Sequence, residues 1–141
     1  MFRFTTIAPL KKGVVTCRMN ITITSQNKEE YLLIESKGDV ETKEDLIRHC
    51  DLVFEEISKY DAKKILIYEP ETTFPLEIYP YFDLVKHYTE TFPPDIKSLK
   101  IAAVLAKEFR EIAETWETLC VSRGFDYFVF TSFQEAENWI K

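Results

Sequence analysis

Runs of hydrophobic residues along the chain predict five β-strands. VVTCRMNITIT (14–24) alternates and is rich in β-branched residues, and YLLIESKG (31–38) follows after the short polar stretch SQNKEE. We therefore expect these two strands to be antiparallel neighbours. KILIY (64–68) and LKIAAVLA (99–106) are continuous apolar runs, as expected for parallel strands covered on both faces, and FDYFVFT (125–131) has strong β propensity.

Between the second and fourth strands, the spacing of apolar residues predicts two helices. Thr42 with Asp45 three residues later is a typical capped start for the first helix. The apolar face of this helix is expected to be Leu46, Ile47, Cys50, Val53, Phe54 and Ile57. Pro80 suits the first turn of the second helix, which is expected to end near Thr89.

Two further helices are predicted after the fourth and fifth strands. The third ends at Gly124, where a left-handed cap is favoured, and Ser132 with Glu135 makes a capping box for the fourth. The expected order is β-β-α-β-α-β-α-β-α. Such alternation predicts an α/β fold, a mixed and mostly parallel sheet flanked by helices.

Length and composition fit one domain in a reducing compartment. The chain has 141 residues, of which 45% are hydrophobic, and it contains no linker or repeat. We assign residues 19–141 to the domain and residues 1–18 to an N-terminal extension or an extra edge strand. Cys17, Cys50 and Cys120 form no CxxC pair and are expected to be reduced. No signal peptide or membrane-spanning run is evident, so we expect a cytoplasmic protein.

The charge of the protein disfavours several kinds of partner. The net charge is -6 and the pI is about 5.0, which argues against nucleic acid and anionic membranes as partners. The glycine-rich loops that hold phosphate groups are absent, and we expect no cofactor. His49 and His87 lack a second ligand at metal-binding spacing, so both are expected to be surface or boundary residues rather than metal ligands or catalytic groups.

Acidic residues gather after the third strand, at the edge where open α/β sheets usually bind ligands. Glu69, Glu71 and Glu77 are read as part of a loop that begins after Tyr68. A solvated acidic loop is the simpler interpretation. An enzyme that uses Glu69, Glu71 and Lys107 in one crevice is the alternative, and it is disfavoured because no activated nucleophile or metal set is present.

The second helix carries more aromatic residues than one buried face can hold. Its core stripe is expected to be Tyr81, Leu84, Val85 and Tyr88. Phe74, Ile78, Tyr79 and Phe82 remain outside this stripe. Either they form an exposed patch for a partner, or Phe74 and Ile78 fold over the sheet and only Tyr79 and Phe82 are partly exposed.

The chain resembles the STAS superfamily, and in particular its SpoIIAA-like bacterial branch, from about Met19 to Lys141. The resemblance is carried by the hairpin that ends in LLIESKGDVETKEDL, by KILIYEP, by LKIAAVLAKEF and by FVFTSFQEAENWIK. It implies a regulatory or interaction domain without enzymatic activity or cofactor. Anti-sigma antagonists of this family carry a phosphorylatable serine in an Asp-Ser motif after the third strand. Here EPETTFPLEIYP has no serine, and Thr72 and Thr73 are its only hydroxyls besides tyrosine.

The resemblance places the functional surface at the loop and helix entry after the third strand. We expect a protein partner, or a second copy of the chain, to bind there. The candidate partner-binding residues are Glu69, Glu71, Thr72, Thr73, Phe74, Tyr79 and Phe82. Because the wider fold group includes lipid-binding proteins of the Sec14 type, a small apolar ligand or lipid is the alternative.

Overall fold

The computed structural model describes residues 20–141, which form a five-stranded sheet with helices on both faces. The strands are β1 (Thr22–Asn27), β2 (Leu32–Asp39), β3 (Lys64–Thr73), β4 (Lys100–Leu105) and β5 (Asp126–Phe130). Their order across the sheet is β1-β2-β3-β4-β5. β1 and β2 are antiparallel and all other neighbours are parallel, as predicted. The predicted extension 1–18, Cys17 and the first part of the predicted strand 14–24 lie outside the described residues.

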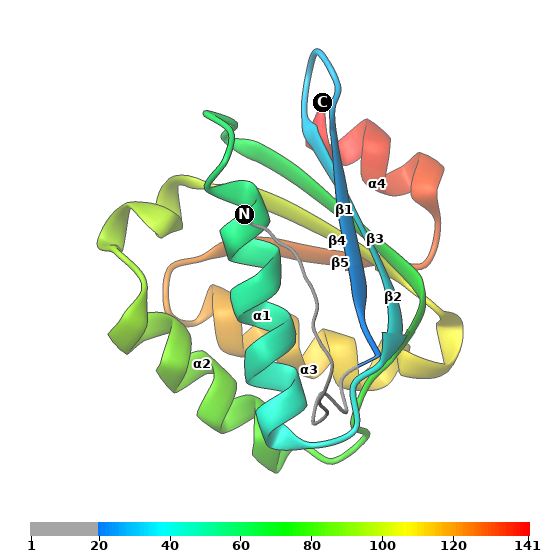
Figure 1. Cartoon of the computed structure of the whole chain (residues 1–141), viewed down its shortest axis with the longest axis vertical. Coiled ribbons are helices and arrows are strands. Elements are labelled where there is room, and N and C mark those ends of the chain that lie inside the picture. Colours follow the sequence, from blue (N-terminus) through cyan, green and yellow to red (C-terminus); the bar gives the residue numbers. More distant parts are fainter. Residues whose placement is uncertain (1–19) are drawn as a thin grey trace, which may run out of the picture.

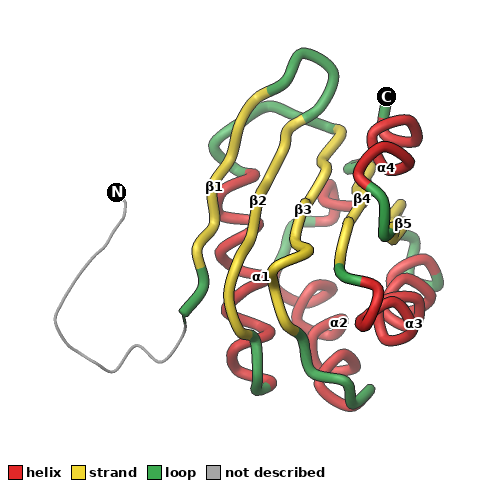
Figure 2. Tube along the Cα trace, turned by 90° about the vertical axis from the view of Figure 1, so that its right-hand side faces the viewer, coloured by secondary structure: helices red, strands yellow, loops and turns green. Residues whose placement is uncertain are grey.

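The helices divide unequally between the two faces of the sheet. They are α1 (Lys43–Ile57), α2 (Tyr79–Thr91), α3 (Arg110–Val121) and α4 (Phe133–Ile140), with short 3-10 turns η1 (Pro94–Ser98) and η2 (Lys107–Phe109). α1, α2 and α3 pack together over one face and bury the larger core. α4 alone covers part of the other face; Figure 2 shows the first three strands side by side, with α1 behind them and α4 at the C-terminal end. The predicted α/β order is confirmed.

The helix ends follow the local sequence signals. Thr42 Oγ1 accepts a hydrogen bond from Asp45 N, and the Asp45 carboxylate accepts one from Thr42 N, so the predicted capping box is present. Ser132 Oγ accepts from Glu135 N at the start of α4, which is one of the two hydrogen bonds of the predicted capping box. Gly124 follows α3 with φ of 89°, the positive value that the predicted left-handed cap requires. Cys50 and Cys120 are buried free thiols.

Two strands end more than one residue later than predicted. β1 continues to Asn27, so part of the stretch read as a turn is strand. β3 continues to Thr73, so the expectation that the chain from Glu69 to Thr73 is a loop was wrong. The polar residues there pair with β2, where Lys37 lies opposite Glu71 and Asp39 opposite Thr73.

A bulge in β3 explains this difference. While β2 advances from Glu35 to Lys37, β3 advances from Tyr68 to Glu71, so β3 carries one extra residue. Pro70 lies within this extra step, where its missing N–H breaks no ladder hydrogen bond. A proline that is typical of a loop is therefore accommodated inside a strand.

Candidate functional site

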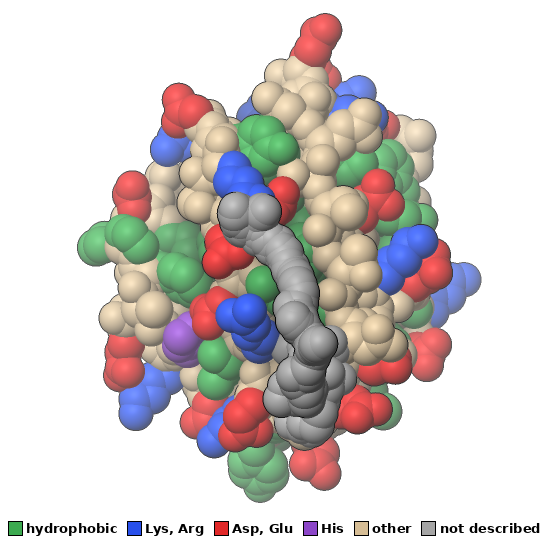
Figure 3. All heavy atoms as spheres, viewed as in Figure 1, with side chains coloured by type: hydrophobic (Ala, Val, Ile, Leu, Met, Phe, Trp, Pro, Cys, Tyr) green, Lys and Arg blue, Asp and Glu red, His purple; other side chains and the backbone are tan. Residues whose placement is uncertain are grey.

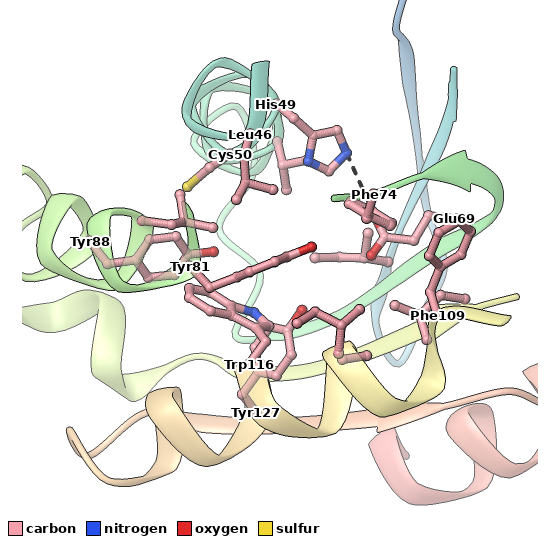
Figure 4. A pocket seen from close by; sticks show the side chains of 16 residues that line it. Leu46, His49, Cys50, Glu69, Phe74, Tyr81, Tyr88, Phe109, Trp116 and Tyr127 are labelled. Carbon is pink, nitrogen blue, oxygen red and sulfur yellow. Dashed lines mark ion pairs between the residues drawn. The ribbon is translucent and has the colours of Figure 1, made fainter. Parts of the chain in front are cut away.

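A cavity of about 60 Å³ lies between the sheet and helices α1, α2 and α3 (Figure 4). Its walls are mainly apolar and aromatic and include Leu46, Val53, Ile67, Phe74, Leu84, Leu105, Phe109, Ile112, Trp116 and Tyr127. Ala113 and Cys50 contribute small side chains. Strands β3, β4 and β5 supply one wall, and helices α1, α2 and α3 with the turn η2 supply the others.

Glu69 is the buried acidic residue of this cavity. It is the last residue of β3 that pairs with β4, and only 4% of its surface is exposed. Its Oε1 atom is buried and has no hydrogen-bond partner. Native proteins nearly always satisfy such atoms, so this oxygen is the most unusual polar group of the site.

His49 of α1 faces Glu69 across the upper wall of the cavity. Its Nε2 lies 3.6 Å from Glu69 Oε1, which is beyond hydrogen-bond distance. A dashed line joins the two residues in Figure 4. Nε2 is instead 3.0 Å from Ser36 Oγ, which is 2.9 Å from Thr72 Oγ1. Ser36, His49 and Thr72 therefore form a buried polar chain beside the carboxyl group.

Burial keeps both titratable groups of this pair neutral near pH 7. It raises the pKa of the Glu69 carboxyl to about 8 and lowers the pKa of the His49 imidazole to about 4. The two residues stand within ion-pair distance, but removing both from water disfavours the charged forms more than their attraction favours them. Glu69 is therefore protonated and His49 unprotonated.

Phenol groups complete the lining of the cavity. Burial raises the pKa of Tyr81, Tyr88 and Tyr127, and the nearby Glu69 contributes to the effect at Tyr81 and Tyr127. The Tyr81 hydroxyl donates a hydrogen bond of 2.7 Å to the carbonyl oxygen of Pro75. This bond ties α2 to the segment that leads into it.

Three apolar side chains are exposed where β3 passes into α2. Leu76 is 68% exposed, Tyr79 75% and Phe82 46%. We call these three residues the α2 entry surface. In Figure 3, hydrophobic side chains protrude at the lower end of the molecule, where α2 begins, while acidic and basic side chains are mixed over the rest of that face.

The seven predicted partner-binding residues fall into two groups. Glu69 and Thr72 are buried, and Phe74 is half-buried with its ring edge-on to His49, 5.6 Å between centroids. Glu71 and Thr73 are exposed on β3, and Tyr79 and Phe82 on α2. Phe74 and Ile78 pack on the core, as the second interpretation expected, whereas Tyr79 and Phe82 are exposed, as the first interpretation expected.

The structure also tests the predicted burial of the α2 core stripe and of the two histidines. The predicted core stripe Tyr81, Leu84, Val85 and Tyr88 is confirmed. His49 was expected at the surface or boundary, which is wrong because it is 7% exposed. His87 is a boundary residue, as expected, and its Nε2 lies 2.8 Å from Asp51 Oδ1.

The catalytic set considered from the sequence does not assemble. Glu69 points into the cavity, Glu71 pairs with Lys37 at 3.8 Å in solvent, and Lys107 is exposed. Across residues 20–141, no three His, Cys, Asp or Glu side chains stand close enough to hold a metal ion. None of the helices in that part of the chain has the length and hydrophobicity needed to cross a membrane.

Comparisons with known proteins identify the fold. No family model matches the chain, and no curated protein matches it. An uncharacterized protein of the DUF3478 family with a SpoIIAA-like fold from Shewanella loihica PV-4 is similar in structure, with a TM-score of 0.53 and 17% identity over 92% of this chain and 100% of that one. An anti-sigma factor antagonist from Mycobacterium paratuberculosis has a TM-score of 0.54 and 11% identity over 86% of this chain and 94% of that one. At these identities the likeness shows the fold alone, and the chain has a STAS or SpoIIAA-like fold.

Proposed function

We propose that this protein is a non-enzymatic regulatory domain that binds a protein partner through the α2 entry surface. The observation that carries the proposal is the exposure of Leu76, Tyr79 and Phe82 within one turn and its preceding loop. Aromatic residues and leucine that are exposed together are typical of contact sites, since water is released when a partner covers them. A structural neighbour named as an anti-sigma factor antagonist supports a protein as the target.

Acidic residues around the α2 entry surface suggest the chemistry of the partner. Glu77 and Asp83, which are its neighbours in the sequence, are exposed, and Asp83 is paired with Lys43 of α1 at 3.7 Å. A partner with an apolar pocket and a basic rim would match both features. The free thiols of Cys50 and Cys120 fit a reducing compartment such as the cytoplasm.

Of the two threonines at the end of β3, one is accessible to a kinase. Thr72 is 1% exposed and hydrogen bonded to Ser36, so an enzyme cannot reach it without opening the sheet. Thr73 is exposed and its hydroxyl donates to Asp39 Oδ1 at 3.2 Å. A phosphate on Thr73 would stand beside Asp39 and Glu71, so repulsion would separate β2 from the end of β3.

Site-specific photocrosslinking tests the partner surface. A photoreactive phenylalanine at position 79 is expected to crosslink a single partner, or a second copy of the chain, in cells. The matched control places the same group at Val121, an exposed apolar residue at the far end of α3. Equal labelling from positions 79 and 121 would contradict the proposal.

A second candidate function is the carriage of a small apolar ligand. It is supported by the cavity beneath α2, whose walls are largely apolar and aromatic. This function does not compete with partner binding, because the cavity and the α2 entry surface use different side chains of α2.

A further inference from the structure

Glu69 presents an unsatisfied hydrogen-bonding atom to an apolar cavity. Its side chain is 6% exposed, Oε1 has no partner, and the residue lines the space between the helices and the sheet (Figure 4). We propose that the cavity binds a small uncharged molecule with an apolar body and one hydroxyl or amide group, which is hydrogen bonded to Glu69. The inference rests on the carrier function and names the class of its ligand.

The other polar groups near the cavity are already engaged. The Tyr81 hydroxyl donates to Pro75, and Ser36 bridges His49 and Thr72. Each of these groups already has a hydrogen-bond partner, whereas Oε1 of Glu69 is buried without one. Glu69 is therefore the residue for which a ligand's polar group would satisfy an unmet hydrogen bond.

The size of the cavity limits the ligand. A water molecule needs about 10–15 Å³ of such space, so about 60 Å³ holds roughly four to six atoms of similar size. Among the lining residues only Phe74 and Ile112 are partly exposed, so entry passes beside these two side chains. The ligand class is thus a short-chain alcohol or amide rather than a complete lipid.

The walls disfavour a charged ligand. An ion that leaves water loses its hydration energy unless an opposite charge meets it in the protein. Glu69 and His49 face the cavity in their neutral forms, and Tyr81, Tyr88 and Tyr127 are neutral as well. An ammonium group would have to be met by an ionised Glu69 and a carboxylate by a protonated His49, and burial opposes both of these charged forms.

Methyl-group NMR titrations of the whole chain test this class. Three probes of equal length are compared at neutral pH: butan-1-ol, pentane and n-butylammonium. The methyl signals of Ile67 and Leu84, which line the cavity, report occupancy. We expect butan-1-ol to shift both signals and to bind more tightly than the other two probes.

Variants at Glu69 isolate the hydrogen bond. Glu69→Met is expected to weaken butan-1-ol binding about tenfold while pentane binds at least as well, and Glu69→Gln is expected to retain butan-1-ol. Glu71→Met, on the exposed side of the same strand, is the control and should change neither.

Each contrary outcome has a distinct meaning. If pentane binds wild type as tightly as butan-1-ol, the polar anchor is refuted and the carrier function stands. Tighter binding of n-butylammonium would refute the uncharged class. If no probe shifts the methyl signals, the cavity holds water only, and both the inference and the carrier function fail.

Discussion

Glu69→Gln is expected to stabilise the folded protein by about 3 kcal/mol at pH 7 and to have almost no effect at pH 4. Burial raises the pKa of Glu69 to about 8 in the folded state, from 4.5 as its ordinary value. The unfolded chain therefore releases this proton as the pH rises above 4.5, whereas the folded chain keeps it until about 8. The free energy of unfolding therefore decreases as the pH rises through that range. A glutamine has no proton to release, so the variant does not show this decrease.

The pKa shift of His49 changes stability with pH in the opposite direction. Its pKa falls from 6.5 to about 4 on folding, so stability is lost as the pH decreases from 6.5 to 4. From these two groups, wild type should show nearly constant stability between pH 4.5 and 6.5 and a decline from 6.5 to 8. Tyr81 and Tyr127, which also approach Glu69, stay neutral over this range because their pKa values are raised.

Urea denaturation between pH 4 and pH 8 measures both effects. Glu69→Gln should show stability that rises from pH 4 to 6.5 and then levels, because only His49 remains. Glu71→Gln is the matched control, and as an exposed substitution it should change stability by less than about 0.5 kcal/mol. If the free energy of unfolding of Glu69→Gln varied with pH in parallel with that of wild type, Glu69 would be ionised in the folded protein.

Gly38→Ala is expected to destabilise the protein by about 3 kcal/mol. Gly38 has φ of +134°, and a Cβ there would lie 2.0 Å from the backbone oxygen of Asn20. The new methyl group would force the segment just before β1 away from the end of β2. Because Gly38 also pairs with Thr72, the movement would reach the polar chain beside the cavity.

Gly124→Ala separates backbone strain from the steric clash. Gly124 also has positive φ, +89°, but a Cβ there meets only the Lys97 side chain, at 3.7 Å and beyond. The expected loss is about 1 kcal/mol, from the conformation alone. Equal losses in the two variants, measured by chemical denaturation, would show that β1 does not approach Gly38 so closely.

The sequence predicted the order of elements well because apolar spacing and caps are local signals. Thr42 with Asp45, and Gly124 after α3, act within a few residues of the helix ends they define. β3 was cut short because Pro70 and its acidic neighbours resemble a loop. Pairing with β2 and the bulge decide otherwise, and neither is visible in the local composition.

The burial of several residues in the candidate site was not predicted from the sequence. Leu76 was missed, although it lies between two residues already considered, Phe74 and Ile78. His49 stands three residues after Leu46 and four before Val53, so helical spacing alone could have put it on the buried face. Its meeting with Glu69 depends on how α1 crosses β3, which the sequence does not encode locally.

The most direct test of the proposed function is the affinity for the partner that crosslinks at position 79. We predict that Tyr79→Ser combined with Phe82→Ser weakens binding at least about thirtyfold, as expected for aromatic residues at the centre of an interface, with an unchanged melting temperature. Val121→Ser, at an exposed apolar position on α3, should leave the affinity within about twofold. Wild-type affinity in the Tyr79 and Phe82 double variant would contradict the assignment of the α2 entry surface.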